Sequence, residues 1–179
     1  MTNNNPNQTT KRIKTVCWAA SLLFTLAAFF LDQWTKHLAV LHLKGKASIP
    51  IIRDVFELRY LENRGAAFGI MQGRQYFFVV VTVIICTVIL LCFARMPFKA
   101  KYLPLRICAV LIWAGAAGNM ADRLRLNYVV DFFDFCLIDF PVFNVADCYV
   151  VAACILFALL ILFYYRDEHD FDFLRRGVQ

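Results

Sequence analysis

The chain has 179 residues, of which 61% are hydrophobic and 18% are charged, and its formal net charge is +6. This apolar fraction excludes an ordinary soluble domain and indicates a protein whose surroundings are largely lipid. The positive charge suits contact with anionic headgroups, so we expect membrane lipids as partners and no nucleic acid.

Four apolar stretches have the length of transmembrane helices, because about 20 residues cross a hydrocarbon core about 30 Å thick. They are 16–34, 77–94, 105–121 and 148–165. The first stretch follows basic residues, so a cleavable signal peptide is the alternative to a retained helix. No small-x-small cleavage motif precedes Asp32 and three further spans follow, so we keep it as a helix. The predicted fold is a mainly α membrane protein, a four-transmembrane-helix bundle.

The distribution of basic residues predicts the topology, since basic loops favour the cytoplasm. The link between the second and third spans carries four bases and no acid: Arg95, Lys99, Lys101 and Arg106. We therefore place this link inside, together with a partly disordered tail 1–15, Asn-rich over 3–8, and a solvated tail 166–179. A single membrane domain, 16–165, then exposes outer loops 37–76 and 122–147. The first outer loop also contains basic residues, so the topology depends on the higher density of bases in the short link rather than on their number.

The first outer loop contains a pattern typical of a half-buried strand. Over 55–61, Phe56, Leu58 and Tyr60 alternate with charged residues, and this period of two predicts a small extracytoplasmic sheet. The sheet leads into 63–69, where Gly65, Gly69 and two alanines permit a tight turn. An ordinary loop is the alternative for this segment.

The second outer loop, 124–143, mixes five phenylalanines with three aspartates. Aromatic rings favour the membrane interface, so we expect an aromatic loop or helix seated on the bilayer. Two of the seven cysteines, Cys136 and Cys148, lie near this face. Because both lie near the outer face, a disulfide is the alternative, but we expect two free thiols.

Two Asn-x-x-Asp steps flank this loop, Asn119/Asp122 and Asn144/Asp147, with Asp131 between them. Residues three apart share a helical face, so each step would present an amide beside a carboxyl group. Carboxylates beside lipid-facing spans are costly, and their presence suggests a site at the membrane surface.

The chemistry open to such a site is that of paired carboxylates. Motifs for serine nucleophiles, nucleotide loops and zinc peptidases are missing from the sequence, and the histidines lack metal-ligand spacing, so we expect no metal or cofactor. Two close carboxyl groups share protons, and one can activate water while the other binds a carbonyl. In the structural alternative, Asp122 pairs with Arg123 or Arg125 and Asp147 caps the fourth span. From the residues alone, Asp122 and Asp131 cannot be told apart.

Five blocks of the sequence resemble the successive signature motifs of lipoprotein signal peptidase, also called signal peptidase II. They occur in the family's order from the first span to the fourth, so the match is specific. The blocks are Asp-Gln-Trp-Thr-Lys at 32–36, Asn-Arg-Gly-Ala-Ala-Phe-Gly at 63–69, Gly-Asn-Met-Ala-Asp-Arg at 118–123, Val-Val-Asp-Phe at 129–132 and Phe-Asn-Val-Ala-Asp at 143–147. The departures are mild: Phe140 stands where tryptophan is frequent, and Asn127 stands near a common glycine.

The resemblance implies an intramembrane aspartic endopeptidase of the bacterial cytoplasmic (inner) membrane, with its active site near the outer face. Its substrates would be prolipoproteins whose lipobox cysteine carries diacylglycerol, cut just before that cysteine. By motif position, Asp131 and Asp147 would be the catalytic pair, and we expect a monomer. Supporting or substrate-binding roles would fall to Asp32, Lys36, Asn63, Gly65, Asn119, Asp122, Arg123 and Asn144.

One ion pair is also predicted by spacing, because Lys36 follows Asp32 at i+4 on the first helix. The plainer alternative for Asp32 is an acid at the end of a span, wetted by headgroups.

Two other functional classes would explain part of this pattern. An ion-coupled transporter also places acids among helices, but its fold usually shows inverted repeats and interrupted spans near the midplane. A non-catalytic scaffold that binds lipid or a partner helix would explain the aromatic loop and the basic link. It would not explain the paired Asn-x-x-Asp steps.

Overall fold

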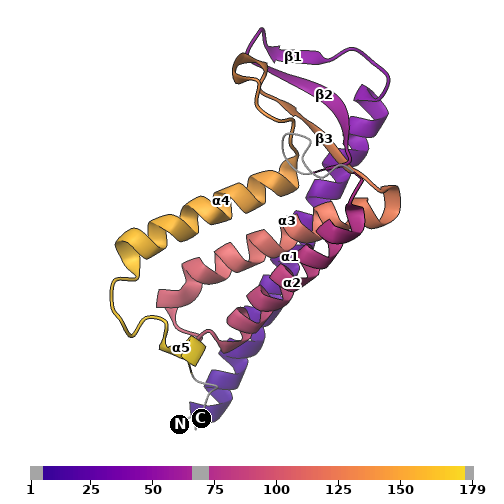
Figure 1. The fold of residues 1–179 in the computed structure, drawn as a ribbon. Helices are drawn as coiled ribbons and strands as arrows, with labels where there is room; N and C mark the ends of the chain where they lie inside the picture. The colour runs from indigo at the N-terminus through magenta and orange to yellow at the C-terminus, as the bar shows by residue number, and fades with distance from the viewer. Residues whose placement is uncertain (1–5, 66–72, 176–179) are drawn as a thin grey trace.

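A long third helix organises the computed structural model, which describes residues 6–65 and 73–175 (Figure 1). Within these residues, four helices are long and apolar enough to cross a membrane. They are α1 (Pro6–Leu43), α2 (Gln75–Arg95), α3 (Leu103–Leu126) and α4 (Val145–Leu159), the last continued by a π-helical turn, η4 (Leu160–Tyr164). α3 packs against α1, α2 and α4, so the predicted mainly α fold with four candidate spans is confirmed.

The first helix is longer than predicted at both ends. α1 has 38 residues, about 57 Å at 1.5 Å per residue, so it extends well beyond a hydrocarbon core. It starts at Pro6, so residues 6–8 are helical where disorder was predicted, and it continues into what was predicted as the loop 37–76. The predicted bounds reflect the thickness of the hydrocarbon core, but a helix continues until the sequence terminates it. The chain turns only near Gly45, whose φ of 72° is a conformation that glycine adopts without strain.

The ends of α3 and α4 carry residues that were predicted to lie in the second outer loop. α3 continues to Leu126 and stops at Asn127, a left-handed residue with φ of 62°. α4 begins after Asn144, which is its N-cap. Asp122 and Asp147 are therefore helical residues, while Asp131 lies between the helices.

A three-stranded antiparallel sheet covers one end of the described bundle, in the order β1 (Ile49–Ile52), β2 (Phe56–Asn63), β3 (Val129–Asp134). The predicted small sheet and the strand character of 55–61 are confirmed. The prediction of an aromatic loop or helix for the second outer segment was incomplete, because β3 is its first part, and a 3-10 turn, η3 (Cys136–Ile138), follows. β3 is buried along almost its whole length, and its sequence Val-Val-Asp-Phe-Phe-Asp lacks the alternation that identified β2.

The C-terminal segment is exposed over 166–169, as expected for a solvated tail, but two of its later residues are buried against the helices. A short 3-10 turn, η2 (Ala100–Tyr102), precedes α3, and the last element, α5 (Asp172–Arg175), returns to it. Phe173 and Asp170 are buried, the former against the Tyr102 ring and the latter in an ion pair with Lys101. Aromatic packing and this pair hold a stretch that its charges alone predicted to be free.

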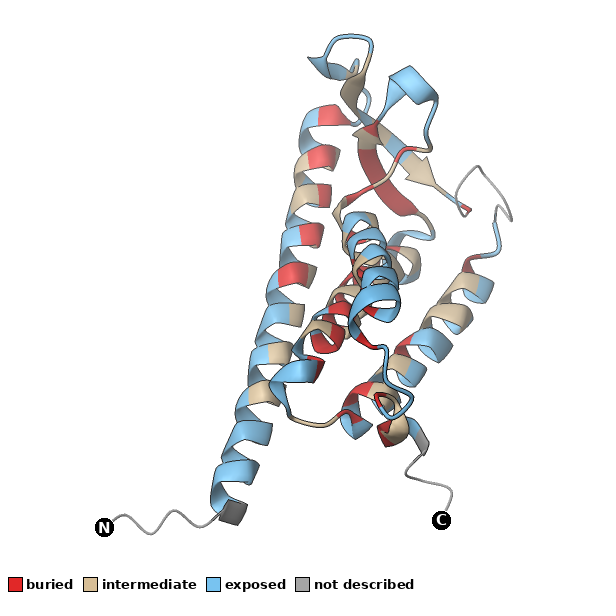
Figure 2. Cartoon of the chain, turned by 90° about the vertical axis from the view of Figure 1, so that its left-hand side faces the viewer, coloured by how far each residue is buried: buried red, intermediate tan, exposed pale blue. Residues whose placement is uncertain are grey.

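The buried residues follow one side of α1 and much of α3 (Figure 2). Near the sheet, Ala39 and Leu43 of α1 pack with Val130 and Phe132 of β3. The described ends of the chain both lie at the opposite end of the molecule, on different sides of it (Figures 1 and 2). Asn119, Asp131, Asn144 and Asp147 gather between the sheet and the helices, where β3 and the start of α4 meet α3.

Candidate active site

Asp131 projects from β3 into the layer between the sheet and the helices. Its side chain is almost completely buried, with 1% of its surface exposed. The side-chain amide of Asn63 on β2 donates to its Oδ2 at 2.8 Å, and that of Asn144 donates to its Oδ1 at 2.6 Å. β2 and β3 are hydrogen-bonded neighbours, so the sheet itself brings Asn63 to Asp131.

Asp147 lies in the first turn of α4 and completes a capping box. The backbone amide of Asn144 donates to its Oδ2 at 3.1 Å, and its own backbone amide donates to Oδ1 of Asn144 at 3.1 Å. The capping alternative is therefore realised for Asp147. Its Oδ1 remains available and accepts the side-chain amide of Asn119 at 2.8 Å, so capping and a site role coexist.

Asn119 and Asn144 connect the two acids. The amide nitrogen of Asn144 donates to Asp131 and also to Oδ1 of Asn119, the latter at 3.1 Å. Asn119 in turn donates to Asp147. The expectation that Asn144 and Asp147 would share a helical face does not hold, because Asn144 is the extended N-cap residue. From the N-cap position, its side chain contacts the carboxyl group of Asp131, the backbone amide of Asp147 and the side chain of Asn119.

A buried charge cluster stands behind these amides. Lys36, with 3% of its side chain exposed, contacts Oδ2 of Asp32 at 3.0 Å and Oδ2 of Asp122 at 3.1 Å. Its third contact is Oδ1 of Asn119 at 2.8 Å, so each ammonium hydrogen has a partner. The predicted pair of Lys36 with Asp32 is confirmed. Asp32 is fully buried, which excludes the alternative of a headgroup-exposed acid, and Asp122 pairs with Lys36 rather than with a neighbouring arginine.

The charge cluster holds two backbone segments in place. Oδ1 of Asp32 accepts the amide of Ala146 in the first turn of α4 at 2.9 Å. Oδ2 of Asp122 accepts the amide of Val130 on β3 at 3.2 Å. These are the residues directly before Asp147 and Asp131, so the cluster fixes both candidate acids relative to Asn119. Gln33 completes it by donating to Asp122 and to the carbonyl of Gly118.

Two glycines of α3 allow the other elements to approach this closely. A Cβ on Gly118 would overlap Oδ2 of Asp32, and one on Gly115 would overlap the carbonyl oxygen of Ala146. A side chain at either position would push α4 or α1 away from α3. Gly118 belongs to a motif block, but its packing role could not be seen in the sequence.

A cavity of about 580 Å³ opens beside the two acids. Six of the predicted site residues line it: Asn63, Gly65, Asn119, Arg123, Asp131 and Asp147. The other four predicted residues, Asp32, Lys36, Asp122 and Asn144, are buried behind this wall. Asp131 lines the cavity and Asp122 does not, so the structure distinguishes these two acids where the sequence alone could not. Positions 66–69 of the Gly65 motif block lie outside the described residues.

Most of the remaining cavity wall is apolar and was not predicted. Phe140 and Phe143 of the second outer segment contribute, and Val151 and Ile155 extend the wall along α4. The two α4 residues lie four and eight positions after Asp147, so projecting the helical face of that acid would have found them. Cys148, also at the wall, is a free thiol, as is Cys136, which confirms the prediction that they do not pair.

Arg123 brings a cation to the cavity. Its guanidinium lies 5.0 Å from the centre of the Phe78 ring on α2, which is cation–π geometry. Within the described chain, its Nε is buried without a hydrogen-bond partner. An arginine in this state can bind an oxygen that a ligand brings.

The electrostatic environment of Asp131 favours its protonated form. Burial raises the pKa of Asp131 to about 7, and the neighbouring charge of Asp147 acts in the same direction, against the hydrogen bonds from Asn63 and Asn144. A carboxyl group of this kind holds a proton near neutral pH. The cavity can therefore offer a carboxyl group that keeps its proton beside a second carboxyl group, which is an arrangement that acid–base hydrolysis can use.

Comparison with known proteins agrees with the motif blocks. The family described as Signal peptidase (SPase) II matches residues 24–163. The lipoprotein signal peptidase of Caldanaerobacter subterraneus subsp. tengcongensis is 44% identical over 135 residues, which cover 75% of this chain and 90% of that protein. The lipoprotein signal peptidase of Halothermothrix orenii is 42% identical over 146 residues, covering 82% and 95% of the two chains.

Two solved structures of bacterial membrane enzymes have a similar fold. The first, determined by the in meso method at 2.3 Å resolution, superposes with a TM-score of 0.72 at 32% identity and covers 84% of this chain and 93% of its own. The second, at 1.9 Å resolution, gives a TM-score of 0.69 at 30% identity, with 82% and 94% covered.

Proposed function

The chain belongs to the signal peptidase II family, and on that basis we propose that it is a membrane aspartic endopeptidase acting on prolipoproteins. It removes the signal peptide from precursors whose lipobox cysteine already carries diacylglycerol, and it cuts just before that cysteine. Asp131 and Asp147 are the catalytic pair.

One observation carries this proposal: a strand acid and a helix acid line the same cavity and are joined through the two asparagines. Purely structural acids would bury their oxygens against fixed donors, as Asp32 and Asp122 do behind the wall. Asp131 and Asp147 instead combine fixed donors with access to a space large enough for a ligand.

The proposed reaction uses water as the nucleophile. The ionised carboxylate of Asp147 takes a proton from water, and the water oxygen attacks the scissile carbonyl carbon. Asp131, which carries the shared proton, donates it to the carbonyl oxygen as the tetrahedral diol forms. When the diol collapses, the C–N bond breaks, the amine nitrogen takes a proton from Asp147, and the second hydroxyl proton returns to Asp131. The pair then has its starting protonation, and no covalent intermediate is needed.

The supporting residues keep this pair in position. Lys36 donates to Oδ1 of Asn119, so the amide nitrogen of Asn119 must face Asp147. Arg123 is placed to bind a substrate carbonyl, and Asn63 orients Asp131. The apolar wall along α4 offers a surface for the acyl chains or the signal helix.

The location of the site suits a lipid-anchored substrate. A diacylglyceryl cysteine stays in the bilayer, so the bond before it is reachable only where the membrane meets water. The candidate pair lies where the helices meet the sheet, and the described chain ends lie at the opposite end (Figure 1). We place the site at the outer face of the bacterial inner membrane, with both termini in the cytoplasm.

The test is a gel-shift cleavage assay of the purified protein on a diacylglyceryl-modified prolipoprotein, with the unlipidated precursor alongside. The proposal predicts cleavage of the lipidated form alone by the wild type and none by Asp147→Asn. Asp139→Asn is the matched control, because Asp139 is exposed and its φ of 50° suits asparagine. Equal cleavage of both precursors, or an active Asp147→Asn protein, would show that the proposal is wrong.

A further inference from the structure

A second cavity lies away from the candidate active site, between α1 and α2 and over α3. Its volume is about 600 Å³, within the roughly 300–1,000 Å³ typical of sites for small ligands. Its wall is mostly apolar and includes Trp18 and Leu22 of α1, Leu90 and Phe93 of α2, and Val110 and Trp113 of α3. Within the described chain, none of the candidate active-site residues lines it.

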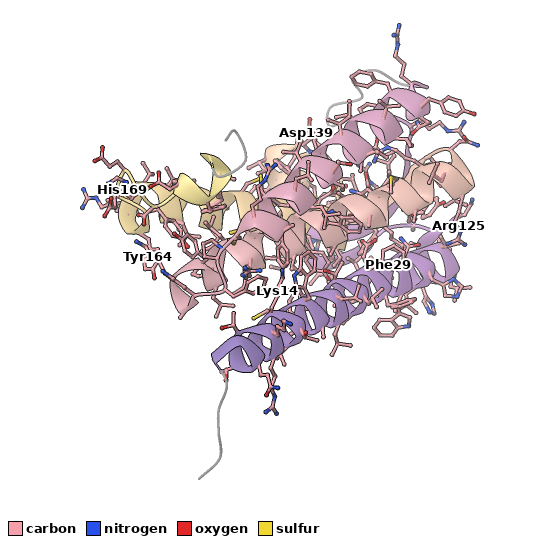
Figure 3. The ribbon with its side chains drawn as sticks, turned by 90° about the horizontal axis from the view of Figure 1, so that it is seen from below. Lys14, Phe29, Arg125, Asp139, Tyr164 and His169 are labelled. Carbon is pink, nitrogen blue, oxygen red and sulfur yellow. The ribbon has the colours of Figure 1, made fainter. Side chains whose placement is uncertain are left out.

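Positive charge gathers at one end of this groove. Lys14 belongs to its wall, and its Nζ lies 5.8 Å from the centre of the Phe98 ring. The guanidinium of Arg106 lies 4.1 Å from the same ring, so both cations meet there. Arg106 is 4% exposed and bonds two carbonyls at the end of α2 through Nη2. Its Nη1 has no hydrogen-bond partner in the described chain. Figure 3 views this end of the molecule and places Lys14 on the side of α1 toward the other helices.

The stretches of chain around this groove carry no acidic residue of their own, and of their bases Lys101 pairs with Asp170 of the C-terminal segment. The sequence contains no Asp or Glu in 1–31 or in 75–121, while the same stretches hold seven bases: Lys11, Arg12, Lys14, Arg95, Lys99, Lys101 and Arg106. An anionic ligand would therefore be attracted to the end of the groove at Lys14.

The length of the groove matches one leaflet of a bilayer. Its α1 wall follows a single helical face from Lys14 through Trp18 and Ser21 to Thr25. These eleven steps cover about 16 Å at 1.5 Å per residue, roughly half of a hydrocarbon core about 30 Å thick. The charged end would match the headgroup of a single lipid, and the apolar channel, which is as deep as one leaflet, would match its acyl chain.

We propose that this groove binds a phospholipid with a net negative headgroup. One acyl chain lies between α1 and α2 against Trp18 and Trp113, and the phosphate lies at Lys14, with the charge of Arg106 behind it. This site is independent of the proposed peptidase activity.

Tryptophan quenching tests the proposal, because two of the three tryptophans line the groove. A Trp34→Phe protein leaves Trp18 and Trp113 as the emitters. It is reconstituted into bilayers of equal parts phosphatidylglycerol and phosphatidylcholine, with brominated acyl chains on one lipid or on the other. Selective binding predicts an apparent affinity for the anionic lipid about fivefold higher, the factor that one basic residue contributes at an anionic surface.

Two variants on the same helix turn distinguish a site from general attraction. Lys14→Gln should bring quenching by the two brominated lipids close to equal. Arg12→Gln, two residues and about 200° around the helix from Lys14, should leave the preference unchanged.

Equal quenching by both lipids in the parent protein would overturn the proposal, as would equal effects of the two variants. Weak quenching by both lipids that depends on protein density would instead mean that a second copy of the chain covers the groove, and this would also overturn it.

Discussion

Replacing Asp131 by asparagine should change how the free energy of unfolding depends on pH. Burial, aided by the charge of Asp147, raises the pKa of Asp131 from 3.8 to about 7. Between these values the folded protein holds a proton that the unfolded chain has released. Because the folded state then binds more protons than the unfolded state, the contribution of Asp131 to stability falls as pH rises through this window.

The size of this effect follows from the shift. Three pKa units at about 1.4 kcal/mol each give a ceiling of about 4 kcal/mol, fully present as a penalty above pH ~8. A chain of this length changes its Tm by roughly 2–4 °C per kcal/mol. The wild type should therefore lose up to roughly 8–16 °C of Tm, relative to Asp131→Asn, between pH ~4 and ~8.

The assay is thermal unfolding in detergent micelles, followed by tryptophan fluorescence at several pH values across this window. The difference in Tm between the two proteins at each pH isolates the effect of Asp131, because the other titrating groups are present in both. Asp139→Asn makes the same chemical change at an exposed position, and its curve should run parallel to that of the wild type. Parallel curves for wild type and Asp131→Asn would refute the reasoning, because they would mean that the folded protein does not hold this proton.

Three further results are expected. Lys36→Met leaves two buried carboxylates unpaired and should lower the free energy of unfolding by about 3–5 kcal/mol in denaturant titrations. Lys44→Met, at an exposed ion pair, should lower it by less than about 1 kcal/mol, and equal losses would count against the buried cluster. Gly118→Ala would overlap a buried carboxylate and should lower both the Tm and the cleavage rate, and an unchanged Tm would contradict the close packing of α1 on α3. Cleavage by the wild type should decline as pH rises above ~7, because the proton on Asp131 is lost, and a rate that keeps rising to pH 9 would exclude that proton from the mechanism.

The sequence predicted the spans and one strand well, and the exceptions have physical reasons. α1 runs past both predicted ends because the chain carries no strong helix terminator between Pro6 and Gly45. Strand β2 was found through its alternation, but β3 is buried along almost its whole length, and its sequence Val-Val-Asp-Phe-Phe-Asp does not alternate between apolar and charged residues. The folded C-terminal segment depends on Phe173 and Asp170 meeting η2, a contact between distant parts of the chain.

The candidate site was predicted as a set of residues, but their separate places required the fold. Asp122 and Asp131 are both acids near one span end, and nothing in their spacing says which of them faces a cavity. In the structure, Asp122 is taken up by Lys36 and the amide of Val130, and Asp131 lines the cavity. The N-cap position of Asn144 likewise depends on where α4 begins.

The most direct test of the catalytic pair is the turnover and the substrate affinity of Asp147→Asn, measured together on a diacylglyceryl-modified prolipoprotein. Asparagine keeps the size and much of the hydrogen bonding of the side chain but cannot take a proton from water. If Asp147 is a catalytic acid, turnover should fall at least about 100-fold while Kd stays nearly unchanged. Turnover within a few-fold of the wild type would contradict the assignment of Asp131 and Asp147 as the catalytic acids.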